Sequence, residues 1–223
     1  MELEDLVSIL LIVISIALSI YALPALPQDL ASHWDMAGEV NGHMPAFWGA
    51  FLMPAISAAL FMMFLAIPLI DPLSANIKAF QKDYHRFILV LILFLFLVHI
   101  QILLWNLGTK IGFNLTIPIL LGGLFFYLGT LLGRVKRNWF IGIRTPWTMS
   151  SDEVWDKTHR LGGKLFKAVG VISILSILLP TGGILVVIAL IIAAAISTVV
   201  YSYLAYRDIM AGRKNVKNKQ SGG

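Results

Sequence analysis

The sequence contains no cysteine and little charge. Without cysteine the chain has neither disulfide bridges nor thiolates, so thiol-based chemistry is excluded. Charged residues make up 13% of the 223 residues and hydrophobic residues 58%, whereas about 25% of a soluble domain is charged. The composition therefore indicates an integral membrane protein rather than a soluble domain.

Four stretches lack Asp, Glu, Lys and Arg altogether, and each is close to the roughly 20 residues that a membrane-spanning helix needs. They are Leu6 to Leu23, Phe47 to Ile70, Phe87 to Leu107 and Leu115 to Gly133. A fifth stretch, Leu165 to Tyr206, has Lys167 as its one charge. As a straight helix it would reach about 60 Å, against a hydrocarbon core of about 30 Å. It must fold back on itself, and Pro180-Thr181-Gly182-Gly183 predicts where.

The positive charges indicate how the chain is oriented. If it crosses the membrane six times, 16 of the 17 Lys and Arg residues fall on one side, and only Lys110 falls on the other. Short loops rich in Lys and Arg remain in the cytoplasm. The sequence therefore predicts an all-α, polytopic plasma-membrane protein with six transmembrane helices and both termini in the cytoplasm. The start Met-Glu-Leu-Glu-Asp lacks the basic region of a secretory signal, so the first helix is expected to be retained.

The predicted spans divide the chain into four parts. Residues 1–75 form a two-helix unit, and its extracellular loop 24–46 is expected to be an ordered cap because it contains several turn-forming residues. Residues 76–133 hold the third and fourth helices. Residues 134–212 hold a polar loop, an interfacial helix and a helical hairpin, and residues 213–223 are expected to be a disordered basic tail.

The extracellular loop carries four side chains of the types that bind zinc, within eleven residues of one another: His33, Asp35, Glu39 and His43. Two imidazoles and one carboxylate would leave a coordination position open, although the spacing matches no zinc signature. The alternative is structural. In that case His33 and Trp34 anchor the loop at the membrane interface, and His43 caps a turn.

The cytoplasmic loop is rich in aromatic and basic residues. Ser150 followed three residues later by Glu153 is a capping-box pattern, which predicts a helix that starts near Ser151 and continues into the fifth span. Trp155 and His159 share one face of that helix. An interfacial amphipathic helix with no further role remains the structural alternative.

A family resemblance rests on this same loop. The segment Asn-Trp-Phe-Ile-Gly-Ile-Arg-Thr-Pro-Trp-Thr, from Asn138 to Thr148, is followed by Trp155, His159 and Arg160. This pattern resembles the signature of SdpI-like proteins, the immunity family against sporulation-delaying peptide toxins. The resemblance implies a polytopic membrane protein that confers immunity to a secreted peptide toxin, in some members joined to capture of a cytoplasmic transcriptional repressor. It implies no mapped catalytic site.

The N-terminal part carries a second resemblance. Pro27, His33-Trp34, Gly38 and Gly42 precede a long hydrophobic helix. This arrangement resembles the small domain of unknown function that commonly precedes the SdpI-like signature. Together the two resemblances cover nearly the whole chain.

The sequence favours a membrane-embedded immunity or receptor protein. A secreted peptide toxin would bind at the extracellular loop or between helices, and the cytoplasmic loop would relay its presence to a repressor. Anionic lipid headgroups are further expected partners of the basic inner face, and no nucleic-acid motif is visible. The residues expected to bind the ligand or partner are Asn138, Gly142, Arg144, Thr145, Trp147, Trp155, His159 and Arg160.

Two other functions remain open. A transporter or channel needs ionisable groups at membrane depth, and His99 is the one such side chain deep in a predicted helix. Alternatively, His99 only hydrogen-bonds a neighbouring helix. A metal-dependent enzyme would use the His33, Asp35, Glu39 and His43 group to activate a water, but no companion nucleophile and base are visible. We therefore expect no enzyme activity, and no cofactor apart from the zinc ion that this loop would hold.

Overall fold

The computed structural model describes residues 2–179 and 183–220. Within these residues six helices are long and apolar enough to cross a membrane. They are α1 (Leu3–Ala22), α2 (Ala46–Ile70), α4 (Gln81–Asn106), α5 (Phe113–Leu132), α7 (Asp152–Leu175) and α8 (Gly183–Gln220). The predicted six-helix architecture is confirmed, and the protein is a multi-pass membrane protein.

Shorter elements connect these helices. Two are α-helices, α3 (Ser74–Ala79) and α6 (Pro146–Ser150), and two are single 3₁₀ turns, η1 (Leu23–Ala25) and η2 (Ser176–Leu178). Two strands, β1 (Asp29–Trp34) and β2 (Val40–Pro45), pair antiparallel. The predicted extracellular loop is therefore ordered, but as a β-hairpin that the all-helical prediction did not include.

The observed helices follow the predicted charge-free stretches, but several extend beyond them: α1 begins at Leu3 rather than Leu6, and α5 at Phe113 rather than Leu115. α4 begins at Gln81, six residues before the predicted Phe87, because ion pairs accommodate the charged residues of its first turns. α8 continues to Gln220, although a disordered tail was predicted from residue 213. No Pro or Gly interrupts residues 213–220, so the helical hydrogen-bond ladder can continue. Residues 221–223 of the predicted tail lie outside the described residues.

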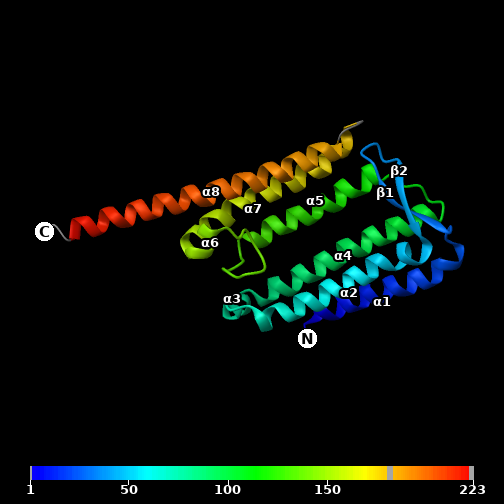
Figure 1. Cartoon of the computed structure of the whole chain (residues 1–223), viewed down its shortest axis with the longest axis horizontal. Helices are drawn as coiled ribbons and strands as arrows, with labels where there is room; N and C mark the ends of the chain where they lie inside the picture. The colour runs from blue at the N-terminus through cyan, green and yellow to red at the C-terminus, as the bar shows by residue number, and fades with distance from the viewer. Residues whose placement is uncertain (1, 180–182, 221–223) are drawn as a thin grey trace.

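The six long helices form two groups of three (Figure 1). Helices α1, α2 and α4 pack together, and so do α5, α7 and α8; the two groups meet along α4 and α5. α7 and α8 lie side by side, as the predicted fold-back requires. The predicted reversal at residues 180–182 lies outside the described residues.

Hydrogen bonds to a buried histidine join the helices of the first group. His99 on α4 is fully buried, and its Nε2 lies 3.1 Å from Ser19 Oγ and 3.2 Å from the Ser15 carbonyl oxygen on α1. Ser19 Oγ also donates to the Ala50 carbonyl of α2, at 2.6 Å. His99 thus makes the hydrogen bonds to a neighbouring helix that the sequence offered as its structural alternative.

Glycines allow the second group to pack closely. A Cβ atom on Gly129 of α5 would lie 2.7 Å from the carbonyl oxygen of Gly163 on α7, and a Cβ on Gly170 would lie 2.6 Å from that of Gly122. Small residues let two membrane helices approach until their backbones touch. Gly122 and Gly129 therefore allow α5 and α7 to approach until their backbones touch.

The polar segments lie at opposite ends of the bundle (Figure 1). One end carries the β1–β2 hairpin, and we call it the hairpin end. The other carries α3, α6 and the loop 133–145, and we call it the loop end. This separation agrees with the predicted topology, while the compartment that each end faces stays a prediction.

Candidate functional site

The loop between α5 and α6 folds around one buried amide. Asn138 is fully buried, and its Oδ1 accepts hydrogen bonds from the backbone N–H groups of Phe140 (2.9 Å) and Ile141 (2.7 Å). Its Nδ2 donates to the carbonyl oxygens of Lys136 (2.8 Å) and Ile141 (2.9 Å). These four bonds satisfy the amide and fix the course of the loop.

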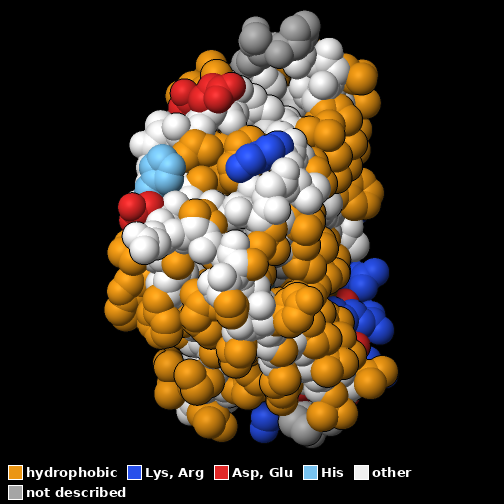
Figure 2. Space-filling model, turned by 90° about the vertical axis from the view of Figure 1, so that its right-hand side faces the viewer, with side chains coloured by type: hydrophobic (Ala, Val, Ile, Leu, Met, Phe, Trp, Pro, Cys, Tyr) orange, Lys and Arg blue, Asp and Glu red, His pale blue; other side chains and the backbone are white. Residues whose placement is uncertain are grey.

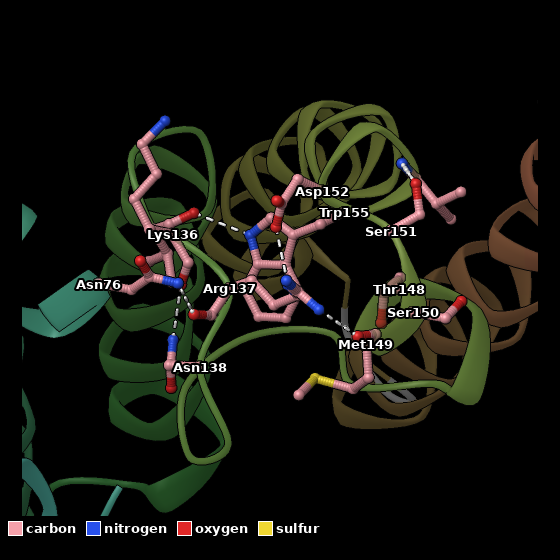
Figure 3. Close-up of polar contacts among 12 residues, drawn as sticks. Asn76, Lys136, Arg137, Asn138, Thr148, Met149, Ser150, Ser151, Asp152 and Trp155 are labelled. Carbon is pink, nitrogen blue, oxygen red and sulfur yellow. Dashed lines mark hydrogen bonds and ion pairs between the residues drawn. The ribbon is translucent and has the colours of Figure 1, made fainter. Parts of the chain in front are cut away.

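Two polar side chains attach this loop to the first helix group. Asp71, just after α2, accepts the backbone N–H of Trp139 at 3.0 Å, and Asn76 on α3 donates to the carbonyl oxygen of Arg137 at 2.7 Å. Figure 3 shows Asn76 beside Arg137 and Asn138. Since the loop also follows α5 of the second helix group, it contacts both groups. A change in their relative position would therefore alter these contacts.

A tryptophan and a histidine on α7 form the floor of the loop. Trp155 is 1% exposed and donates its indole N–H to the Val135 carbonyl oxygen at 2.9 Å. His159 stacks on it, with ring centroids 3.9 Å apart and planes at 19°. Its Nε2 accepts the backbone N–H of Ile143 at 2.9 Å, and its Nδ1 lies 2.8 Å from the Trp155 carbonyl oxygen. This pattern places the proton on Nδ1.

Gly142 crosses directly over these two rings. Its φ of +119° favours glycine, and a Cβ atom there would lie 2.5 Å from His159 Nε2 and 3.0 Å from Trp155 Cη2. The position therefore requires glycine both for its backbone conformation and for the space above the rings. Gly142 shapes the loop and offers no side chain to a ligand.

Arg137 ties the loop to the start of α7. Its Nε donates to Asp152 Oδ1 at 2.7 Å and its Nη1 to the Met149 carbonyl oxygen at 2.6 Å (Figure 3). The helix starts at Asp152, as predicted, but its N-cap is Ser151, whose Oγ accepts the N–H of Val154 at 3.4 Å. The predicted capping box at Ser150 is wrong by one residue, because Ser150 belongs to α6.

Thr145 and Trp147 hold α6 against α8. Thr145 Oγ1 caps α6 by accepting the N–H of Thr148 at 3.1 Å, and it donates to Ser202 Oγ on α8 at 3.0 Å. The Trp147 ring lies 5.2 Å from the Tyr203 ring. The second helix group is therefore joined to the loop as firmly as the first.

The predicted binding residues thus separate into two kinds. Asn138, Thr145, Trp155 and His159 are buried and stabilise the loop, whereas Arg144 and Arg160 are exposed. Arg144 Nη1 donates to the Trp139 carbonyl oxygen. The list of expected binding residues does not include Trp139 itself, which is 51% exposed and whose carbonyl oxygen accepts from Arg144. A partner at the loop end would meet Trp139 and the exposed arginines.

The hairpin end does not gather the predicted zinc ligands. Asp35 Oδ1 accepts the backbone N–H groups of Ala37 (2.8 Å) and Glu39 (3.0 Å), which closes the turn, and His33 Nδ1 hydrogen-bonds Asn41 Oδ1. Within residues 2–179 and 183–220, no three His, Asp or Glu side chains are grouped so that they could hold a metal ion. The arrangement of His33, Asp35, Glu39 and His43 therefore does not support the predicted site.

The hairpin end instead contains a cleft of about 540 Å³ between the two helix groups. Its walls are mainly apolar, and they come from the hairpin and from α2, α4, α5 and α8. Its lining includes Trp34, Met53, Ile102, Phe113, Ile117 and Ile188. No local pattern predicts this cleft, because its walls come from segments far apart in the sequence.

Comparison with known proteins matches both ends of the chain. Residues 134–202 match the SdpI/YfhL protein family, and residues 10–58 match a domain of unknown function, DUF1648. The chain is also 24% identical over 219 residues to the immunity protein SdpI of Bacillus subtilis (strain 168), which covers 94% of this chain and 99% of that protein. No solved structure shows significant similarity to the chain. The resemblance drawn from the sequence is confirmed.

Proposed function

We propose that this chain is a membrane immunity protein that binds a secreted peptide toxin and relays its presence to a cytoplasmic repressor. One observation carries the proposal: the similarity to an immunity protein extends over 94% of the chain and includes both polar ends. That similarity supports a membrane immunity function and points away from an enzyme. Toxin binding and the relay are the further steps that we infer.

The two alternative functions have less support. His99 is fully buried and already hydrogen-bonded between helices, which suits packing rather than ion transport. The metal-dependent enzyme needed a ligand group that the described residues do not form. Immunity therefore accounts best for a multi-pass protein with an ordered structure at each end.

Survival under toxin challenge tests the proposal. The full chain is expressed in Bacillus subtilis that lacks its own immunity protein SdpI, and the cells are exposed to purified sporulation-delaying peptide. We expect survival to rise toward that of cells carrying the native immunity protein. Full sensitivity, with the chain present in the membrane on an immunoblot, would contradict the proposed immunity.

The relay is tested separately at the loop end. Arg144→Ala and Arg160→Ala remove exposed cations. Lys157→Ala is the control, because it removes a partly exposed cation of α7 that pairs with Glu153. We expect the two arginine variants to lose induction of a repressor-controlled reporter while survival is retained, and the lysine variant to behave like the wild type. Unchanged induction in both arginine variants would remove the relay from the mechanism.

The topology assumed here can be tested with cysteine, since the chain has none of its own. We expect a cysteine at position 43 to react with a membrane-impermeant maleimide in intact cells. A cysteine at position 144 should react only after the membrane is opened. Labelling of both positions in intact cells would refute the predicted sidedness and place both polar ends on one side.

A further inference from the structure

The cleft at the hairpin end has the properties of a binding site for an apolar segment that carries a positive charge. Its volume of about 540 Å³ lies within the roughly 300–1,000 Å³ of typical ligand sites. Its lining includes aliphatic side chains from both helix groups and Trp34 stacked on Phe113, with ring centroids 3.6 Å apart. Such walls take up apolar side chains and exclude water.

The indole of Trp34 adds an unused hydrogen-bond donor to this wall. Among the described residues its Nε1–H is buried and has no hydrogen-bond partner. A buried donor without an acceptor is energetically unfavourable, and a carbonyl oxygen of a ligand would remove this cost by accepting a hydrogen bond. Trp155 at the loop end, by contrast, donates its indole N–H to a backbone carbonyl. Among the described residues, the indole N–H at the hairpin end thus lacks the acceptor that Trp155 has at the loop end.

The rim of the cleft favours a cation over an anion. Asp35 lines the rim and is exposed, and no Lys or Arg belongs to the lining in the part of the chain that the structure describes. Its Oδ1 closes the hairpin turn, and no ion pair involving Asp35 is found among the described residues. Figure 2 views this end, where acidic side chains, a histidine and a basic side chain lie among hydrophobic ones. A phospholipid phosphate would meet a carboxylate there, which is unfavourable.

We propose that this cleft binds the secreted peptide itself, through an apolar segment next to an amino group or basic side chain. The apolar segment fills the cleft and the positive group pairs with Asp35. This inference rests on the proposed function, because it names the place where the toxin is held. Since the cleft is lined by α4 on one side and α5 and α8 on the other, an occupant contacts both helix groups.

Binding of a labelled peptide to the full chain in lipid nanodiscs tests this site. Ile188→Trp places a large ring in the cleft, whereas Ile192→Trp, one turn further along α8, changes a residue that is exposed and outside the lining. With fluorescent sporulation-delaying peptide, we expect Ile188→Trp to weaken binding by about tenfold or more. We expect the dissociation constant of Ile192→Trp to stay within about twofold of the wild type.

A second pair of variants avoids any change in volume. Asp35→Asn removes the rim charge but keeps the Oδ1 acceptor that closes the turn, and Asp29→Asn removes an acidic charge from the same hairpin outside the lining. We expect Asp35→Asn to weaken peptide binding about fivefold, mostly at low salt, and Asp29→Asn to have little effect.

The outcomes separate the site from the function. Wild-type binding in both Ile188→Trp and Asp35→Asn would overturn the cleft as the peptide site and leave the immunity function standing. Loss of a co-purified phospholipid from Ile188→Trp, with peptide binding unchanged, would identify the cleft as a lipid site and equally overturn the proposal. If the wild-type chain binds no peptide while it still protects cells, toxin binding itself is refuted at every site.

Discussion

The loop 133–145 at one end of the bundle and the β1–β2 hairpin at the other differ in how their polar side chains are buried and paired. At the loop end, Asn138, Trp155 and His159 are buried, and each has its hydrogen-bonding atoms paired with the backbone. At the hairpin end most polar side chains of the hairpin itself are exposed, whereas Asn106 below it is paired with the backbone of Ala31. The buried indole N–H of Trp34 has no partner among the described residues. A cleft of about 540 Å³ adjoins it.

The difference suggests that the loop end is held in one arrangement, whereas the hairpin end offers a surface that can accept a ligand. The paired groups around Asn138, Trp155 and His159 favour one conformation, because a displacement leaves several of them unsatisfied. Thr158 on α7 is an exception, since its buried hydroxyl has no partner among the described residues. The loop end also contacts both helix groups through Asp71, Asn76 and Ser202. A movement of one helix group against the other would therefore change the contacts of the loop end. At the hairpin end the cleft lies between the two helix groups, so a ligand bound there could cause such a movement.

The largest expected effect comes from adding one methyl group at the loop end. Gly142→Ala combines an unfavourable φ of +119° with a Cβ placed 2.5 Å from His159 Nε2. Gly108→Ala at the hairpin end is the matched control, since its φ is +102° and no described atom lies within 4 Å of its Cβ. We expect the free energy of unfolding to fall by about 3 kcal/mol in Gly142→Ala, because of backbone strain and overpacking. In Gly108→Ala we expect it to fall by about 1 kcal/mol.

Unfolding in mixed micelles of increasing sodium dodecyl sulfate fraction measures both variants. Equal losses at the two glycines would mean that backbone strain alone acts, and that the packing of Gly142 over the two rings contributes nothing.

The next effect compares two asparagines that make different numbers of hydrogen bonds. Asn138→Ala leaves four backbone groups without their partners, whereas Asn41→Ala removes one exposed hydrogen bond to His33. We expect about 2–3 kcal/mol of destabilisation for the buried asparagine and less than about 0.5 kcal/mol for the exposed one. The same micelle titration compares them. Similar values would show that the network at the loop end does not stabilise the fold.

A smaller effect is expected where the loop end meets α8. Thr145→Val and Ser202→Ala each remove one partner of a buried hydroxyl pair 3.0 Å apart. Hydrogen bonds between membrane helices contribute about 0.6 kcal/mol on average, so the double-mutant cycle should give a coupling energy of about that size. A coupling energy of zero would mean that the loop and α8 are not energetically joined by this pair.

The membrane-spanning helices could be predicted because the bilayer excludes charged residues from them. The resulting charge-free stretches can be read directly from the sequence. The hairpin was missed, because Asp29–Trp34 lacks the alternation and β-branched residues typical of a strand. Pairing with β2 and complete burial of Leu30 determine its conformation instead.

The binding role of the loop-end residues stays a prediction. The sequence singled these residues out because an SdpI-like signature contains them, but it did not separate buried from exposed ones. Asn138 and Arg144 look equally available in the sequence, and only the closure of the loop buries the first. The cleft and the unpaired indole of Trp34 depend on contacts between segments that are distant along the chain.

The smallest effects are expected from exposed cations, one at each end. Lys157→Ala breaks an exposed pair with Glu153 at 2.8 Å, and Lys110→Ala removes a cation 4.9 Å from the Trp105 ring centroid. Exposed pairs of either type contribute about 0.5 kcal/mol, because water and salt screen them. We expect both variants to unfold within about 0.5 kcal/mol of the wild type in the micelle titration. A loss above about 2 kcal/mol at either lysine would mean that exposed charge, rather than buried hydrogen bonding, distinguishes the two ends.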